Sequence, residues 1–266
     1  MESRPQAVAL IDEGQVLVSG SVADRPSRLV APAEPVELLG PPPRFVGRGG
    51  EKLDAALHRF SIDVSGLRAL DAGASTGGFT DCLLQSGAVS VVAVDVGRGQ
   101  LHPRLRDDPR VECRERLDIR DVTLETVGGI PVDLATADIS FMSVTRAVPV
   151  LTGEVVAPDS PLLILVKPQF EAGRVEASRG KGVVRHPDIH RRTLAEVAGA
   201  FAGAGADIVG AMPSPITGSA GNLEFLLHVR TPPAGRPAGE RSPTVAGLTD
   251  LVDRAVAEAH GEKATG

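Results

Sequence analysis

The stretch "ALDAGASTGGFTDCLL" at residues 69–84 decides the fold class of this chain. A short apolar run leads to an acidic residue, Asp71, and small residues follow from Gly73 to Gly78. The next residues have the composition of a helix. A strand, a glycine-rich loop and a helix in this order open a doubly wound α/β sheet, which binds its ligand beyond the carboxyl ends of its strands.

The rest of the chain continues this alternation of strands and helices. Apolar runs predict strands at 67–73, 89–97, 110–117, 131–140, 161–168, 206–215 and 222–230. Helices are predicted at 50–60, 77–87 and 187–205. The last strand is expected to run antiparallel to its neighbours, as is usual in this fold. The predicted architecture is a Rossmann-like α/β sheet with an antiparallel last strand.

Segments rich in proline and glycine divide the chain into parts. They predict linkers at 41–47 and 231–243. The main domain is then expected at 48–230, after a small N-terminal segment at 1–40. A helix at 244–260 carries an apolar stripe and is expected to pack on the main domain.

The composition is that of a globular protein, because 42% of the 266 residues are apolar. No apolar run approaches the ~20 residues of a membrane span, and we expect no secretory leader. Cys82 and Cys113 lie too far apart for a metal or redox motif, so a cytoplasmic protein without a metal site is expected.

The net charge of −6 argues against a general nucleic-acid coat protein. It leaves room for a local basic face, such as the arginine cluster at 98–120.

The glycine loop could hold a dinucleotide, a phosphate or S-adenosylmethionine, or it could be a tight turn without ligand. It reads G-A-S-T-G-G, which is neither G-x-G-x-x-G nor a phosphate loop ending in G-K-[ST]. A carboxylate at Asp71 would crowd a pyrophosphate but suits the positive end of S-adenosylmethionine. Asp95 ends the second strand, where it can accept both ribose hydroxyls, and Asp118 could reach the adenine amine. The expected cofactor-binding residues are Asp71, Gly73, Ser75, Thr76, Gly77, Gly78, Phe79, Thr80, Asp95 and Asp118.

Four further residues are predicted to converge at the same edge of the sheet: Lys52, Asp138, Lys167 and Glu224. Only four of the 28 basic residues are lysines, and two of them fall in this group. Two lysines interleaved with two carboxylates suit methylation of a hydroxyl, whose proton must leave as oxygen attacks. A lysine can accept that proton when it is neutral, which burial and a second ammonium favour. The alternative is a set of structural ion pairs at strand ends.

Six motifs together resemble the TlyA-type proteins, also called the hemolysin A family. They are "VGRGGEKL", "LDAGASTGGFTD", "VDVGRGQL", "ADISFMSV", "LVKPQFEAG" and "SGNLEFLLH", spread in order from about Phe45 to Arg230. The resemblance implies an FtsJ-like catalytic domain that uses S-adenosylmethionine for 2′-O-methylation of ribosomal RNA. It implies a cytidine ribose of 16S or 23S RNA as the target. The four residues above then match the family's Lys-Asp-Lys-Glu tetrad, with Lys167 as general base.

The resemblance also covers the N-terminus in part. Relatives begin with an S4-like RNA-binding domain, and residues 3–22 resemble its second helix and following strand. The first helix has no counterpart, so we expect a truncated S4-like segment that is poorly ordered, or a true start upstream of Met1. The expected partner is ribosomal RNA or a ribosomal subunit, with neither DNA nor a membrane, and the oligomeric state is left open. A hemolysin-like membrane-active protein and a methyltransferase for a small hydroxylated molecule are the alternatives.

Overall fold

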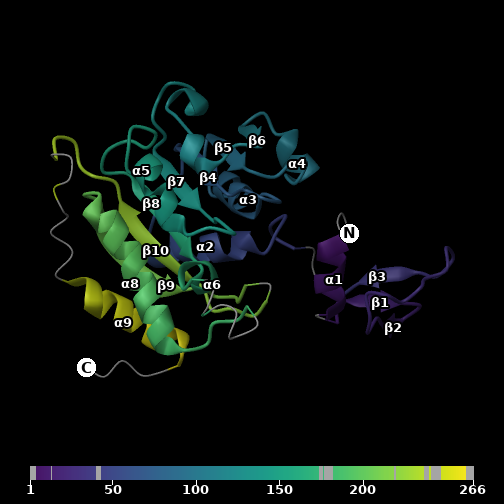
Figure 1. The fold of residues 1–266 in the computed structure, drawn as a ribbon. Helices are drawn as coiled ribbons and strands as arrows, with labels where there is room; N and C mark the ends of the chain where they lie inside the picture. The colour runs from purple at the N-terminus through teal and green to yellow at the C-terminus, as the bar shows by residue number, and fades with distance from the viewer. Residues whose placement is uncertain are drawn as a thin grey trace. The chain divides into compact units, whose positions relative to one another are not determined.

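The computed structural model describes residues 4–12, 14–39, 43–173, 176, 182–218, 220–236, 240 and 247–261. The chain forms two compact units, which are Met1–Arg44 and Phe45–Gly266. The boundary between them falls inside the predicted linker 41–47. Figure 1 shows both units.

The N-terminal unit consists of one helix and a small antiparallel sheet. Its elements are α1 (Arg4–Asp12), β1 (Val16–Val18), β2 (Ser21–Val22) and β3 (Val36–Leu38), with β1 in the middle of the sheet. The helix and the following strand expected near the N-terminus are present as α1 and β1, and Gly14 follows α1 with a φ of +68°. Leu10, Val16, Val18 and Ala23 form a small core. The likeness to an S4 domain remains a prediction.

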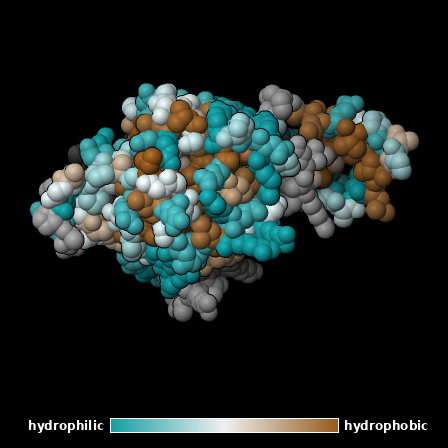
Figure 2. Space-filling view, turned by 90° about the horizontal axis from the view of Figure 1, so that it is seen from above, coloured by the Kyte–Doolittle hydropathy of each residue, from teal (hydrophilic) through white to brown (hydrophobic). Residues whose placement is uncertain are grey.

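Part of the apolar surface of the N-terminal unit faces solvent. Leu29 is 95% exposed, and five more apolar residues are 41–53% exposed: Val22, Val30, Val36, Leu38 and Leu39. Figure 2 shows brown atoms on the surface of this unit. Among the described residues of this unit, four buried residues are a modest core, in line with the difficulty that small domains have in covering their apolar side chains.

The large unit is built on a seven-stranded sheet. Its strands are β4 (Arg68–Ala72), β5 (Ser90–Asp95), β6 (Val111–Glu115), β7 (Leu134–Ala137), β8 (Pro161–Val166), β9 (Asp207–Pro213) and β10 (Phe225–Arg230). The order is β6-β5-β4-β7-β8-β10-β9, and β10 runs antiparallel to both of its neighbours. The predicted doubly wound sheet with an antiparallel last strand is confirmed. The last strand is inserted between β8 and β9.

Helices cover both faces of this sheet (Figure 1). They are α2 (Gly49–Phe60), α3 (Gly78–Gln85), α4 (Pro103–Arg106), α5 (Val148–Leu151), α6 (Pro168–Glu171), α8 (Pro187–Gly203) and α9 (Leu248–Ala259), with 3-10 turns η1 (Ile119–Asp121), η2 (Glu125–Val127) and η3 (Val144–Ala147). One apolar core joins α2, α3 and α4 to the sheet, through Leu53 and Leu83 among others. The other core joins α8 and α9 to the opposite face, through Phe201 and Val252.

The C-terminal helix belongs to this second core. Val252, Ala255 and Val256 of α9 are buried, and α9 packs against α8 and β9. The first residues of the predicted range 244–260 lie outside the described part of the chain. Among the helices that the structure describes, none combines the length and the apolar content that crossing a membrane would require.

Candidate active site

The glycine loop lies where the strand order of the sheet reverses, which is the usual ligand site of a doubly wound fold. Gly73 follows β4 with a φ of +85°, and its N–H donates to the carbonyl of Val94. A Cβ at Gly73 would lie 2.5 Å from the backbone oxygen of Asp138. Two features therefore favour glycine at position 73. Its backbone has a left-handed conformation, and the loop after β7 approaches it closely.

Two adjoining cavities open beside this loop. The larger has a volume of about 250 Å³ and the smaller about 110 Å³. The larger is lined by Gly73, Ser75, Val94, Asp95, Val96, Gly97, Gln100, Leu117, Asp118, Ile119, Asp138, Ile139, Ser140, Phe141 and Met142. The smaller is lined by Gly49, Gly73, Ala74, Ser75, Thr76, Gly78, Phe79 and Asp138. Small and polar residues dominate the smaller cavity, whereas apolar side chains form much of the larger one.

Asp95 and Asp118 both line the larger cavity. The two carboxylate oxygens of Asp95 accept hydrogen bonds from the backbone N–H groups of Ser75 (2.8 Å) and Gly97 (2.6 Å). Each oxygen keeps a lone pair, so Asp95 can still accept a pair of hydroxyls. The Asp118 carboxylate binds the guanidinium and backbone N–H of Arg120, which lower its pKa to about 2. Asp118 is therefore ionised and oriented by Arg120 at neutral pH.

Asp71 was expected to face the positive end of the cofactor, and the structure places its side chain elsewhere. Its side chain is fully buried and lines neither cavity. The carboxylate accepts hydrogen bonds from the hydroxyls of Thr80 (2.6 Å) and Thr136 (3.1 Å). Burial raises the pKa of Asp71 to about 6, against the lowering effect of these hydroxyls. Asp71 therefore ties the start of α3 to β4 and β7 beneath the loop, and its direct contact with a cofactor is not supported.

Two more predicted cofactor residues support the loop from outside the cavities. Gly77 precedes α3 with a φ of +97°, and the side chains of Leu101 and Leu105 occupy the space that a Cβ there would need. Thr80 is buried against Asp71. The sequence reasoning missed Gln100 and Met142, which follow β5 and β7. Their position after strands on either side of β4 was the available signal.

The four predicted catalytic residues are brought to one edge of the sheet as two ion pairs. Lys52 in the first turn of α2 binds Glu224, with 2.5 Å between Nζ and Oε2. Lys167 after β8 binds Asp138 after β7, with 2.5 Å between Nζ and Oδ1. Phe225 pairs with Val166 in the sheet, so Glu224 lies beside Lys167 in register.

Both lysines are nearly buried, with 8% of each residue exposed. Lys167 also donates a hydrogen bond to the hydroxyl of Ser140 (2.7 Å), which lines the larger cavity. Glu224 accepts a second hydrogen bond from the amide of Gln169 (3.3 Å), two residues after Lys167. The two ion pairs are thus connected through the first turn of α6.

The phenylalanines beside these residues are in different environments. Phe141 is 92% exposed with a φ of +69°, and its ring lies 5.8 Å from that of Phe170. Phe225 is fully buried and packs against His190 in the core. The arginine cluster at 98–120 is largely neutralised. Its ion pairs are Arg104–Asp81, Arg106–Glu115, Arg110–Asp108, Arg114–Glu112 and Arg120–Asp118.

The sheet order and the glycine loop at its switch point define a Rossmann-like fold with a ligand site at that loop. FtsJ-like methyltransferases match residues 45–231. The chain belongs to this family and, within it, to the TlyA and hemolysin A proteins.

Its relatives in this group cover nearly the whole chain. It is 43% identical to the 16S/23S rRNA (cytidine-2′-O)-methyltransferase TlyA of Mycobacterium tuberculosis, over 96% of this chain and 92% of the relative. It is 36% identical to Hemolysin A of Brachyspira hyodysenteriae, over 85% and 93% of the two chains. A solved structure from Streptococcus thermophilus, provisionally named a hemolysin, is 35% identical with a TM-score of 0.78, over 98% and 93%.

Proposed function

We propose that this protein transfers a methyl group from S-adenosylmethionine to the 2′-hydroxyl of a cytidine ribose in 16S or 23S ribosomal RNA. The Mycobacterium tuberculosis relative is named for that activity. The observation that carries the proposal is the Lys167–Asp138 ion pair at 2.5 Å, with Asp138 in the wall of both cavities. Ribosomal RNA would place this action in the cytoplasm.

The cavities fit the parts of S-adenosylmethionine. Asp95 has free lone pairs for the two ribose hydroxyls, and Ile119, Leu117 and Met142 offer an apolar slot for the adenine. The small polar residues from Gly73 to Thr76 leave room for the amino-acid end in the smaller cavity. When bound there, the cofactor supplies a methyl group on a positively charged sulfur.

The lysine tetrad would then move the proton of the acceptor. An oxygen–carbon bond forms at the ribose 2′-oxygen while the methyl–sulfur bond breaks and leaves its electron pair on sulfur. In our proposal the hydroxyl proton passes to Lys167 Nζ, and the incoming hydroxyl reaches this amine by displacing Ser140. Asp138 keeps the amine aimed at the cavity and stabilises the ammonium that forms.

The second ion pair has a supporting part in this proposal. Lys52 is 8% exposed and Glu224 is 3% exposed. Their ion pair holds the first turn of α2 against the start of β10. Glu224 also binds Gln169, which keeps the residues after Lys167 in place. We assign the proton transfer to Lys167 because its ion-pair partner Asp138 lines the cavities.

The proposal is tested by measuring cofactor binding and methyl transfer separately. Calorimetry should show binding of S-adenosylmethionine that Asp95→Ala weakens, with Asp63→Ala as a control at an exposed carboxylate. Lys167→Arg should abolish transfer to ribosomal RNA and keep cofactor affinity within a few-fold, because an arginine does not give up its proton. Tight NAD binding without S-adenosylmethionine binding, or an active Lys167→Arg enzyme, would contradict the proposal.

A further inference from the structure

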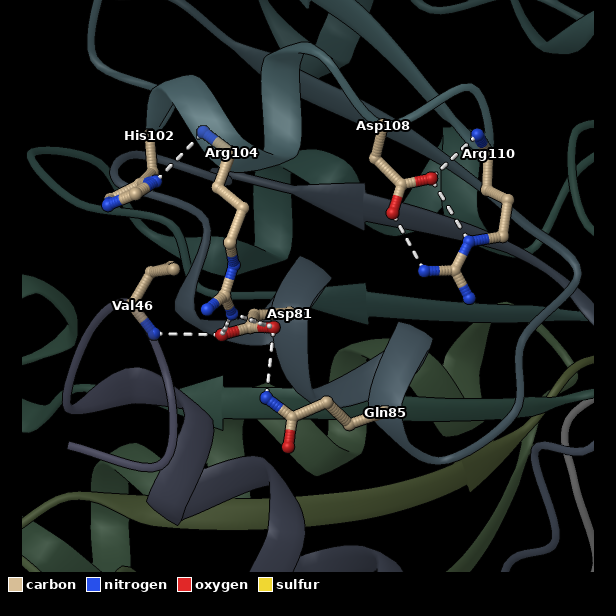
Figure 3. A network of polar contacts seen from close by, with 7 residues as sticks. All are labelled: Val46, Asp81, Gln85, His102, Arg104, Asp108 and Arg110. Carbon is tan, nitrogen blue, oxygen red and sulfur yellow. Dashed lines mark hydrogen bonds and ion pairs between the residues drawn. The ribbon is translucent and has the colours of Figure 1, made fainter. Parts of the chain in front are cut away.

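Asp81 is a buried acid that is neither one of the expected cofactor residues nor one of the four predicted catalytic residues. It lies in the first turn of α3, only 4% of its side chain is exposed, and it lines neither cavity. Figure 3 shows its carboxylate at the centre of a polar network. A buried carboxylate needs several partners to offset its lost hydration, so its partners show which segments it holds together.

The partners of Asp81 come from three places in the chain. The backbone N–H of Val46, just before α2, donates to Oδ2 at 2.8 Å. The guanidinium of Arg104 in α4 donates to both oxygens at 3.1 Å. Gln85, one turn along α3, donates to Oδ1 at 3.0 Å. One carboxylate therefore links the segment before α2 and the helix α4 to the helix that follows the glycine loop.

The first of the linked segments lies directly against the glycine loop. A Cβ on Gly47 would come within 2.8 Å of the Thr76 hydroxyl, and a Cβ on Gly78 within 3.0 Å of the Gly47 carbonyl oxygen. Gly49, two residues further along, lines the smaller cavity. The position of residues 46–49 thus sets one wall of that cavity.

The second linked segment, residues 100–106, contacts the glycine loop from another side. The backbone N–H of His102 donates to the carbonyl of Thr76 at 3.1 Å. Leu101 and Leu105 fill the space beside Gly77. Gln100, which precedes them, lines the larger cavity. A shift of α4 would therefore change the loop and the larger cavity together.

We propose that Asp81 is a positioning residue for the cofactor site, which sets the affinity for S-adenosylmethionine by holding the segments 46–50 and 100–106 against the glycine loop. This inference rests on the proposed cofactor. Asp81 itself lines neither of the two cavities. Its bonds to Val46 and Arg104 are charge-assisted, and bonds of this kind are stronger and more directional than neutral ones.

The replacement Asp81→Asn tests this role. Asparagine keeps an oxygen that can accept from Val46, but it loses the charge and presents an N–H group to Arg104. The affinity for S-adenosylmethionine, measured by calorimetry, should fall about tenfold, the order expected for a lost charge-assisted bond. The KM for the cofactor should rise equally, while kcat at saturating cofactor stays within about twofold, because the tetrad is untouched.

Two further variants separate this role from a general loss of folding. Arg104→Gln should also weaken cofactor binding. The side chain of Arg104 is 63% exposed, so this change should have little effect on the melting temperature. Asp108→Asn is the matched control, because Asp108 forms the neighbouring surface ion pair with Arg110 (Figure 3) and should leave the cofactor affinity unchanged.

Hydrogen exchange on the protein without cofactor supplies an independent measurement. In Asp81→Asn the amides of residues 46–50 and 100–106 should exchange faster than in the wild type, and in Asp108→Asn they should not. Equal exchange in wild type and Asp81→Asn, or equal cofactor affinity, overturns the inference. If the wild type binds no S-adenosylmethionine, the proposed function fails, and the exchange data still decide whether Asp81 positions these segments.

Discussion

Replacement of Asp71 by asparagine should change the way in which the stability of this protein depends on pH. Asp71 is fully buried, and burial raises its pKa from 3.8 to about 6. The folded protein therefore holds the Asp71 proton more tightly than the unfolded chain does. The resulting contribution to stability is complete below about pH 4 and is lost as the pH rises through about 6.

The size of this effect follows from the same two pKa values. The difference between 3.8 and about 6 corresponds to about 3 kcal/mol, since one pKa unit corresponds to about 1.4 kcal/mol. An asparagine does not titrate, so it removes this dependence while keeping the shape of the side chain. The free energy of unfolding of the wild type, relative to Asp71→Asn, should fall by about 3 kcal/mol between about pH 3 and about pH 8.

Urea unfolding at a series of pH values measures this difference. Asp63→Asn is the control, because Asp63 is exposed and hydrogen bonds from Ser65 lower its pKa. A lowered pKa contributes stability that is lost as the pH falls, so the control should show the opposite slope or none. A difference between wild type and Asp71→Asn that stays constant over this pH range would refute the reasoning.

Three further outcomes are expected. Lys167→Arg should lower kcat by at least about 10²-fold, the smallest usual contribution of a general base, in single-turnover methylation assays. Gly73→Ala should cost about 1–3 kcal/mol in urea unfolding and weaken cofactor binding, because its φ is +85° and its Cβ would crowd Asp138. Gly66→Ala, with a φ of +78° and open space around it, should cost only the backbone part. Glu224→Gln should lower stability by about 3–5 kcal/mol by leaving Lys52 buried without a charge partner, and Lys52→Met in addition should restore much of it.

Much of the fold could be predicted because some inner strands of the large unit are nearly continuous apolar runs. β5 reads "SVVAVD" and β8 reads "PLLILV", and both are buried on two faces. The convergence of Lys52, Asp138, Lys167 and Glu224 also followed from the sequence, because each stands at the end or start of an element whose direction the fold class fixes. Which lysine forms an ion pair with which carboxylate could not be predicted from the sequence, because this depends on the register of β10 against β8.

The environment of Asp71 could not be predicted from its position at a strand end. The strand ends one residue later, at Ala72, and this places the Asp71 side chain between Thr80 and Thr136. The hydrogen-bond partners of Asp81 could not be predicted from the sequence either. Its partners Val46 and Arg104 lie 35 and 23 residues away in sequence, and no local pattern brings them together. Side-chain direction at loop ends is set by tertiary packing, which a single sequence does not specify.

The central claim is that this protein methylates the 2′-oxygen of a ribose in ribosomal RNA with Lys167 as base. The most direct measurement incubates the protein with isotopically labelled S-adenosylmethionine and ribosomal RNA, digests the RNA to nucleosides and identifies the labelled nucleoside by mass spectrometry. Our account predicts label in 2′-O-methylcytidine with the wild type and none with Lys167→Arg. Label on a nucleobase, label in small molecules alone, or equal labelling by both proteins would contradict it.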